Sequence, residues 1–352
     1  MFYNVIIIGA GISGNRIADI LSRKGLRVLV IEEHSKVGFP SKCTGLVSQR
    51  IKELLPFLDD KIFLNEIKIG KFIFKKEFFE LKPKSKIYVI DRIKLDESIY
   101  RRAIANGVEY KFGERFLSGE LLNDRVVVKT SIGKYEGDVL VGADGPFSAV
   151  AKNFKLYEET EFFIGLQSTI KGDFEKEKVE VWFGENIAPE FFAWVVPLNS
   201  KIARIGLATK KNTLAYFRRF LRRRVKKVVY PDTSGIIKIG LIKKTVSNRV
   251  LLVGDAAMQV KPFSGGGVIY SLIASEVASL AILKAFKSKN YTEEFFKTNY
   301  ESLWRKKLES GIKKGLLLRK LFYFGGDKSI SFWFKLLPYF KTIVEYFDFD
   351  LL

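Results

Sequence analysis

Cysteine and histidine are almost absent from this chain. Its 352 residues include one cysteine, Cys43, and one histidine, His34. A lone cysteine excludes an intrachain disulfide and is typical of a reducing compartment. A lone histidine excludes a metal site built from several histidines, and we predict no metal site of any kind. A Ser-His-Asp triad would have to use His34 as its base, and we interpret His34 instead as a surface loop residue.

Long apolar runs are also absent. No stretch of 18 consecutive apolar residues occurs, so the sequence predicts no membrane-spanning helix. The N-terminus leads directly into an apolar strand, without a basic segment or a cleavage site, and therefore predicts no signal peptide. We expect a cytoplasmic protein, and leave open a peripheral contact with the inner face of the cell membrane.

Positive charge and aromatic side chains are abundant. Lys and Arg total 60 against 39 Asp and Glu, a formal net charge of +21. Such an excess favours a lipid phosphate, a membrane surface or an acidic electron donor, and a solvated surface is the plain alternative. We predict no nucleic-acid partner. The 31 Phe residues support a large core with apolar surface to spare for a greasy ligand.

The chain begins with a strand–helix–strand pattern. Residues 4–8 form a β-branched run, which is typical of a buried parallel strand. A helical stretch follows at 15–24, and 27–31 predict a second strand. The three elements together form a βαβ unit with a glycine-rich turn after its first strand.

That turn carries a dinucleotide fingerprint. Gly9 is expected to form the tight turn, Gly11 to let a diphosphate approach the backbone, and Gly14 to allow close helix–strand packing. The helix N-terminus favours the negative charge of the diphosphate. Glu32, at the end of the second strand, is placed to accept hydrogen bonds from the ribose of an adenosine.

Two later motifs indicate FAD rather than a nicotinamide cofactor. Residues 138–148, DVLVGADGPFS, and 249–257, RVLLVGDAA, resemble the DG and GD motifs of glutathione-reductase-type flavoproteins, more narrowly the para-hydroxybenzoate-hydroxylase-like branch. The resemblance implies that Asp255 hydrogen-bonds the ribityl chain. Gly266, Gly267 and Val268 then open a helix, and we expect their backbone N–H groups to face the flavin.

These motifs predict an α/β fold in which a β-rich substrate domain interrupts an FAD-binding domain. The predicted FAD-binding domain comprises 1–62, 91–155 and 245–285. The predicted substrate-binding domain comprises 63–90 and 156–244, and 286–352 form a helical C-terminal region.

The sequence further resembles the geranylgeranyl reductase family, particularly the archaeal enzymes that saturate digeranylgeranyl-glycerophospholipids. The resemblance runs from about residue 5 to 305. Four stretches carry it: GFPSKCTGL at 38–46, RIKLD at 92–96, GDAAMQVKPFSGGG at 254–267 and PEFFAWVVP at 189–197. Met258 stands where the family usually has Gly, and Phe192 and Val196 replace Tyr and Phe of the family motif PxxYxWxFP.

The resemblance implies roles for residues that face the cofactor. Cys43, Thr44 and Gly45 are expected to reach the flavin, and Cys43 is the candidate catalytic residue. Arg92 is expected to contact FAD, and Phe116 to touch the adenine through its backbone. Two ordinary explanations stay open: Cys43 as a small buried hydrophobe, and Arg92 as a solvated helix start.

The implied activity is reduction of C=C double bonds in geranylgeranyl or other isoprenoid lipid chains, by hydride transfer from reduced flavin. Phe192 and Trp194 are the implied substrate-binding residues, unless they are ordinary strand residues. The implied partners are the lipid and an electron donor, either reduced ferredoxin or NAD(P)H. A flavin-dependent monooxygenase or halogenase is the alternative, because 192–197 is also close to the halogenase motif WxWxIP. A non-catalytic electron carrier is a third possibility.

Overall fold

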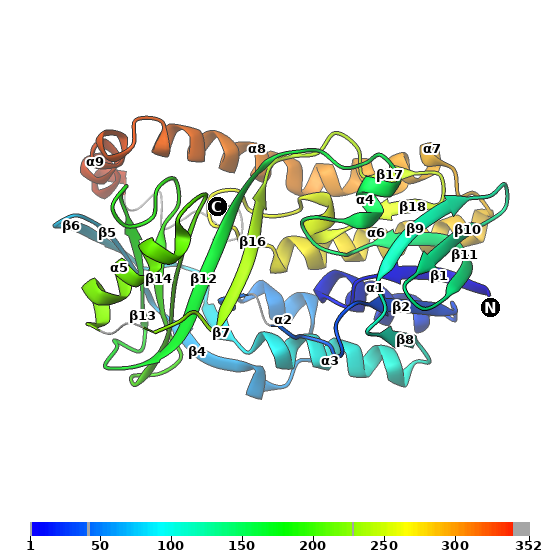
Figure 1. The fold of residues 1–352 in the computed structure, drawn as a ribbon, viewed down its shortest axis with the longest axis horizontal. Helices are drawn as coiled ribbons and strands as arrows, with labels where there is room; N and C mark the ends of the chain where they lie inside the picture. The colour runs from blue at the N-terminus through cyan, green and yellow to red at the C-terminus, as the bar shows by residue number, and fades with distance from the viewer. Residues whose placement is uncertain (1, 41–42, 227–228, 341–352) are drawn as a thin grey trace.

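The computed structural model describes residues 2–40, 43–226 and 229–340. A large sheet lies toward one end of an elongated molecule, and a second sheet lies toward the other (Figure 1). The order of the large sheet is β17-β18-β11-β1-β2-β8, with β10 and β9 attached to β11. Its strands are β1 (Phe2–Ile8), β2 (Val28–Glu32), β8 (Glu109–Phe112), β9 (Phe116–Leu121), β10 (Val126–Thr130), β11 (Lys134–Gly142), β17 (Val246–Ser247) and β18 (Val250–Leu252).

Strand β1 is buried on both faces, as its β-branched sequence predicts. Val5 and Ile7 pack into the cluster that contains the helices, whereas Ile6 and Ile8 pack with the β9–β10 side. Strands β2 and β11 flank β1 in parallel. Helix α1 (Ile12–Ser22) packs against α3 (Arg92–Ala105) and α6 (Val268–Ser288).

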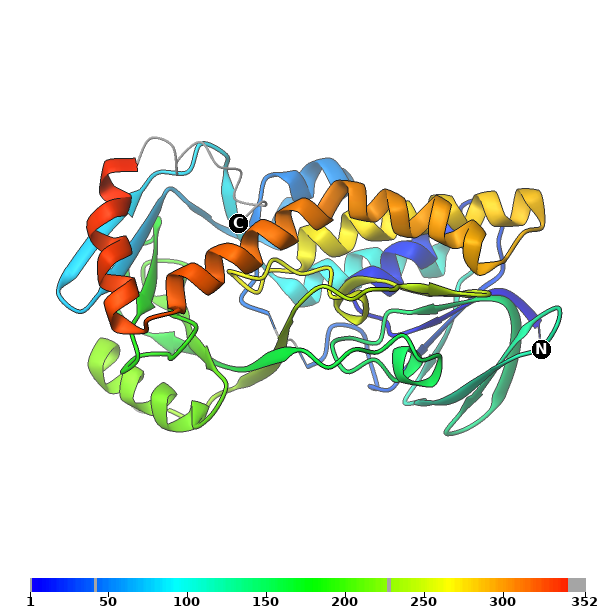
Figure 2. The ribbon, with the colours of Figure 1, turned by 90° about the horizontal axis from the view of Figure 1, so that it is seen from above.

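Helix α6 is long and apolar enough to cross a membrane by length and composition alone. In the structure, however, 78% of its apolar window is buried inside the protein. It lies beside α8 (Ser302–Tyr323) along the molecule (Figure 2) and also contacts α1. The burial is that of a core helix.

The second sheet has seven strands in the order β16-β12-β15-β14-β13-β5-β6. All neighbours are antiparallel except β13 and β5, and helix α5 (Thr213–Val225) packs on β12 and β15. The strands are β5 (Ile69–Phe74), β6 (Glu77–Leu81), β12 (Glu161–Lys171), β13 (Lys178–Phe183), β14 (Ala193–Pro197), β15 (Ile202–Thr209) and β16 (Thr233–Ile239).

A small sheet connects segments that the sequence assigns to different domains. It has the order β3 (Leu46–Ser48), β7 (Ile87–Ile90) and β4 (Phe63–Ile67). Strand β3 directly follows the Cys43 segment, whereas β4 and β7 belong to the predicted substrate domain. The exact domain boundaries stay a prediction.

The C-terminal region is helical as far as the structure describes it; residues 341–352 lie outside the described part. Helix α8 runs from beside α6 toward the far end of the seven-stranded sheet, where α9 turns away from it (Figure 2). The helices are α7 (Glu293–Phe296), the π-helical turn η3 (Lys297–Glu301), α8 (Ser302–Tyr323), α9 (Asp327–Leu336) and η4 (Leu337–Phe340). Shorter helices elsewhere are α2 (Arg50–Leu54), η1 (Asp60–Ile62), α4 (Ala149–Asn153) and η2 (Gly254–Ala257).

Candidate FAD site

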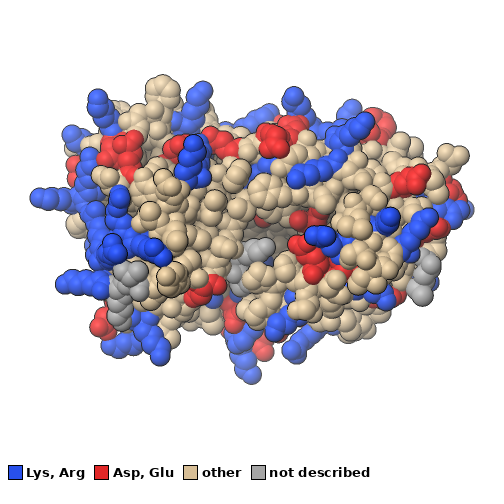
Figure 3. Space-filling view, viewed as in Figure 1, with Lys and Arg blue, Asp and Glu red and all other residues tan. Residues whose placement is uncertain are grey.

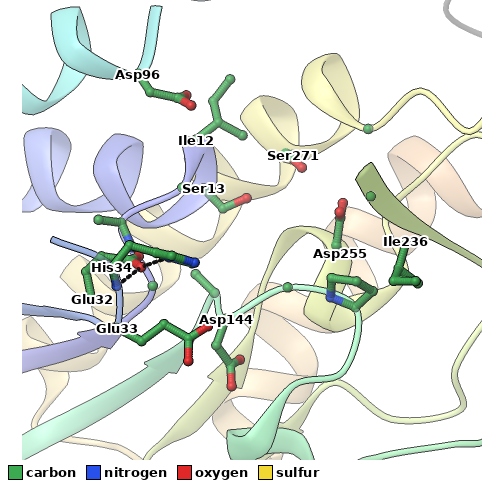
Figure 4. Close-up of a pocket in the computed structure, with 18 of the residues that line it drawn as sticks. Ile12, Ser13, Glu32, Glu33, His34, Asp96, Asp144, Ile236, Asp255 and Ser271 are labelled. Carbon is green, nitrogen blue, oxygen red and sulfur yellow. Dashed lines mark hydrogen bonds and ion pairs between the residues drawn. The ribbon is translucent and has the colours of Figure 1, made fainter. Parts of the chain in front are cut away.

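A cavity of about 710 Å³ lies between the two larger sheets. Residues at the ends of β1 and β2 line it on one side, and residues of β12 and β16 line it on the other. Glu32, Glu33 and His34 lie at one end, and Asp255 and Ile236 lie at the other (Figure 4). This volume is within the range of cavities that hold cofactors and small ligands.

The three glycines of the turn occupy three different steric environments. Gly9 has a φ of +101°, and a Cβ there would lie 2.4 Å from the carbonyl oxygen of Ala143. A Cβ on Gly14 would lie 1.9 Å from the carbonyl oxygen of Gly9, so α1 packs directly on the end of β1. A Cβ on Gly11 would meet no atom within 4 Å, and Gly11 lines the cavity. The open space at Gly11 fits a diphosphate at the N-terminus of α1.

Glu32 connects the glycine turn to the loop after β2. Its Oε2 accepts a hydrogen bond from the Ala10 N–H at 2.7 Å. Its Oε1 accepts one from the His34 N–H at 2.9 Å and lies 2.5 Å from His34 Nδ1 (Figure 4). His34 is half-buried and lines the cavity, as does the buried Phe116. The ribose contact of Glu32 and the adenine contact of Phe116 stay predictions.

Two half-buried carboxyl groups, those of Asp144 and Asp255, line the cavity. Burial raises the pKa of Asp255, and the positive charge of Arg92 offsets this only in part. Burial also raises the pKa of Asp144, whose Oδ1 accepts a hydrogen bond from the Ser148 hydroxyl at 2.6 Å. Half-buried carboxyls of this kind need hydrogen-bond donors, and the hydroxyl groups of a ribityl chain would supply them to Asp255.

Arg92, the first residue of α3, lies on the cavity wall beside Cys43. Its Nη2 donates to both carboxylate oxygens of Asp96 at 3.0 Å. Its buried Nε has no hydrogen-bond partner among the described residues. Because the side chain is only 14% exposed, Arg92 is not a solvated helix start. An unpartnered donor on a cavity wall fits a ligand that carries acceptor atoms, as FAD does.

The Cys43 segment is held by residues of the seven-stranded sheet. The Cys43 sulfur accepts a hydrogen bond from the Gly45 N–H at 3.3 Å, and Cys43 lines the cavity. The Thr44 hydroxyl donates to Gln167 Oε1 at 2.8 Å, and the Thr44 carbonyl accepts from Arg204 Nη1 at 2.6 Å. The segment is therefore fixed from the side of the predicted substrate domain.

Trp194 reaches the same segment indirectly. Its Nε1 donates to Gln167 Oε1 at 3.0 Å, so one buried oxygen accepts hydrogen bonds from both Trp194 and Thr44. Phe192 stacks on Phe191 with ring centroids 4.5 Å apart. Neither Phe192 nor Trp194 lines the cavity, and their binding of substrate stays a prediction.

The cavity wall includes residues that no motif marked. Ile164 of β12 and residues 234–238 of β16 form part of it, as do Ser13 and Ser271. Among the described residues, no group of three or more His, Cys, Asp or Glu side chains is placed to hold a metal ion. Of the predicted site residues, the cavity is lined by Gly9, Gly11, Glu32, Cys43, Arg92, Phe116, Asp255, Gly267 and Val268, but not by Gly14, Thr44, Gly45, Gly266, Phe192 or Trp194.

The comparison with known families agrees with this geometry. A family model described as FAD binding domain matches residues 3–272, a stretch that contains every residue lining the cavity. The chain belongs to this FAD-binding domain family. FAD is its cofactor, and the open glycine turn, the unpartnered Nε of Arg92 and the half-buried Asp255 are consistent with a bound FAD.

Curated relatives and solved structures resemble this flavoprotein over most of its length. A digeranylgeranylglycerophospholipid reductase 2 of Methanothermobacter thermautotrophicus is 27% identical, covering 94% of this chain and 90% of its own. A digeranylgeranylglycerophospholipid reductase of Methanosarcina acetivorans is also 27% identical, covering 91% and 84%.

Solved structures establish the fold. A geranylgeranyl bacteriochlorophyll reductase-like protein from Thermoplasma acidophilum superposes with a TM-score of 0.86 at 21% identity, covering 93% of this chain and 89% of its own. A flavin-dependent brominase superposes with a TM-score of 0.73 at 19% identity, covering 92% and 88%. The predicted glutathione-reductase-type fold of the para-hydroxybenzoate-hydroxylase-like branch is confirmed.

Proposed function

We propose that this flavoprotein is a reductase that saturates C=C double bonds in geranylgeranyl or related isoprenoid lipid chains. The observation that carries the proposal is the position of Cys43 on the wall of the FAD cavity, next to Arg92. The resemblance to named digeranylgeranylglycerophospholipid reductases over 94% of the chain supports the choice of substrate class.

The proposed reaction needs an apolar site and an early proton. An isolated C=C bond accepts hydride poorly, so protonation must assist the transfer and water must be kept out. Reduced FAD, when bound, supplies the hydride to one alkene carbon. The side chains of Ile164, Ile236 and Ile237 provide an apolar wall, and the Cys43 thiol, or a water it orients, gives the proton to the other carbon.

Two arginines lie near the Cys43 sulfur. Both Arg92 and Arg204 interact electrostatically with the Cys43 sulfur. Arg204 keeps its place through hydrogen bonds from Nη1 to the carbonyl oxygens of Thr44 and Ile90.

The electron donor that fits the surface is an acidic protein such as reduced ferredoxin, with NAD(P)H as the alternative. Arg219, Arg222 and Arg223 of α5 are exposed and have no ion pair within the described part of the chain. Lys and Arg side chains gather over α5 at one end of the molecule (Figure 3). A positive patch of this kind attracts an acidic partner over long range.

We propose further that the protein lies in the cytoplasm, in peripheral contact with the inner membrane face.

A flavin-dependent monooxygenase or halogenase is the second candidate. Trp194 and Pro197 match two positions of the halogenase motif WxWxIP, but Phe192 stands where that motif has its first Trp.

Anaerobic reoxidation of the chemically reduced protein tests the proposal. A geranylgeranyl lipid should reoxidise the flavin, and the matching fully saturated lipid should not. Cys43→Ser should retain FAD and slow the reoxidation. Gly45→Ala, a neighbouring substitution, is not a suitable control, because its Cβ would lie 2.5 Å from the Ile90 carbonyl oxygen. If the unsaturated lipid leaves the flavin reduced under anaerobic conditions and only a later addition of oxygen reoxidises it, the result would support the monooxygenase class instead.

A further inference from the structure

Helix α8 presents an apolar stripe to the surface. Leu317, Leu321 and Phe324 are 59%, 49% and 86% exposed. Their spacing of four and three residues places them on one side of the helix. The opposite side holds the helix to the protein through buried residues that include Leu308 and Ile312. The stripe is therefore not needed for packing within the chain as described.

Basic residues surround this α8 stripe. Lys313, Lys314 and Lys320 are exposed next to it. Between residues 302 and 340, Lys and Arg outnumber Asp and Glu by nine to two. The two acids, Glu309 and Asp327, already form ion pairs with lysines of this chain. The surface combines an apolar centre with an excess of positive charge.

We infer that the α8 stripe docks the protein on an anionic lipid bilayer. The three apolar side chains would enter the boundary between headgroups and acyl chains, and the lysines would lie against lipid phosphates. A second copy of the chain fits less well, because a symmetric contact would bring lysines against lysines. An acidic protein would match the charges without needing three exposed apolar side chains, whereas a bilayer satisfies both features.

Sedimentation of the FAD-loaded protein with lipid vesicles tests this inference. The protein should bind vesicles that contain phosphatidylglycerol and should not bind vesicles of phosphatidylcholine alone. Replacing Leu317, Leu321 and Phe324 together by Ser should weaken binding by about tenfold or more. A control variant replaces by Ser two apolar residues exposed elsewhere on the surface, Ile132 (72% exposed) and Leu280 (60%). It should bind like the wild type. Replacing lysines beside the stripe by Gln should weaken binding by about fivefold each.

Three results would overturn the inference. One is equal binding of the stripe variant and the wild type, and another is loss of binding only when the exposed arginines of α5 are replaced. The third is a lipid-free dimer of the wild type that the stripe variant dissociates, because a second copy would then cover the stripe. The assay measures bound protein and not turnover, so its failure would leave the proposed reductase activity untouched.

Discussion

Replacing Gly11 or Gly14 by alanine adds the same methyl group but should have two different effects. Gly11→Ala should weaken FAD binding, and Gly14→Ala should destabilise the fold. At Gly14 the new Cβ would lie 1.9 Å from the Gly9 carbonyl oxygen and 3.2 Å from Ile7 Cγ2. At Gly11 it would meet nothing within 4 Å, and the backbone φ of −75° suits alanine. Gly11 faces the cavity, so its added methyl group would disturb only a ligand there.

The expected magnitudes differ accordingly. Overpacking a core costs about 1–3 kcal/mol and occasionally more, and a backbone contact of 1.9 Å places Gly14→Ala at the upper end. The melting temperature of the apoprotein should then fall by several degrees, at about 2–4 °C per kcal/mol. Gly11→Ala should leave that temperature unchanged. Its methyl group should instead cost the diphosphate a hydrogen bond at the N-terminus of α1. Losing one hydrogen bond to a charged group costs about 1.5–3 kcal/mol, which weakens FAD binding by about 10- to 150-fold.

Two measurements check this pair of variants. Thermal melts of the apoproteins report the packing of α1 on β1, and calorimetric titration with FAD reports the diphosphate site. Gly11→Ala with wild-type FAD affinity would show that the diphosphate lies elsewhere. Gly14→Ala with a wild-type melting temperature would refute the packing argument.

Three further predictions concern other parts of the site. Because burial raises the folded-state pKa of Asp255, the folded apoprotein keeps a proton that the unfolded chain releases above about pH 4. The free energy of unfolding of the apoprotein therefore falls as pH rises above about 4. Asp255→Asn should flatten this fall in thermal melts from about pH 4 to 8. Equal pH dependence of the melting temperature in the variant and the wild type would contradict the argument. Gln167→Leu removes the acceptor that Thr44 and Trp194 share. The effects of Thr44→Val and Trp194→Phe on FAD affinity should be non-additive in the wild type and additive in the Gln167→Leu background. Non-additive effects that persist in that background would refute the shared role. Replacing the exposed arginines of α5 by Gln should slow flavin reduction by reduced ferredoxin, measured by stopped flow, more at about 0.01 M salt than at about 0.1 M. The reason is that the Debye length falls from about 30 Å to about 10 Å between these salt concentrations. A wild-type rate independent of salt would argue against an acidic donor.

The sequence predicted the parts of the fold that depend on local signals. The βαβ unit follows from a β-branched strand, a glycine turn and a helix within about 30 residues, and β1, α1 and β2 lie close to the predicted ranges. The helix begins earlier than predicted, at Ile12, because Gly11 already has the extended backbone of an N-cap residue. Strand β6 was not predicted, since its hairpin turns at Lys75 with a φ of +55°, a position where Gly or Asn would have signalled the turn.

The site was predictable only where a motif marks it. The glycine turn, Glu32, Arg92 and Asp255 belong to motifs and line one cavity. Gln167 carries no such signal, because it meets Thr44 across 123 residues of sequence through the packing of β12. The wall formed by β16 consists of ordinary strand residues, and its place at the cavity depends on the antiparallel pairing of β16 with β12.

The most direct test of the account is mass spectrometry of an isoprenoid lipid after incubation with the chemically reduced flavoprotein under anaerobic conditions. A digeranylgeranyl-glycerophospholipid should gain two hydrogen atoms for each double bond reduced, and a preparation stripped of FAD should leave it unchanged. If the lipid mass stays unchanged while the protein holds reduced FAD and remains folded, the proposal of an isoprenoid reductase is contradicted.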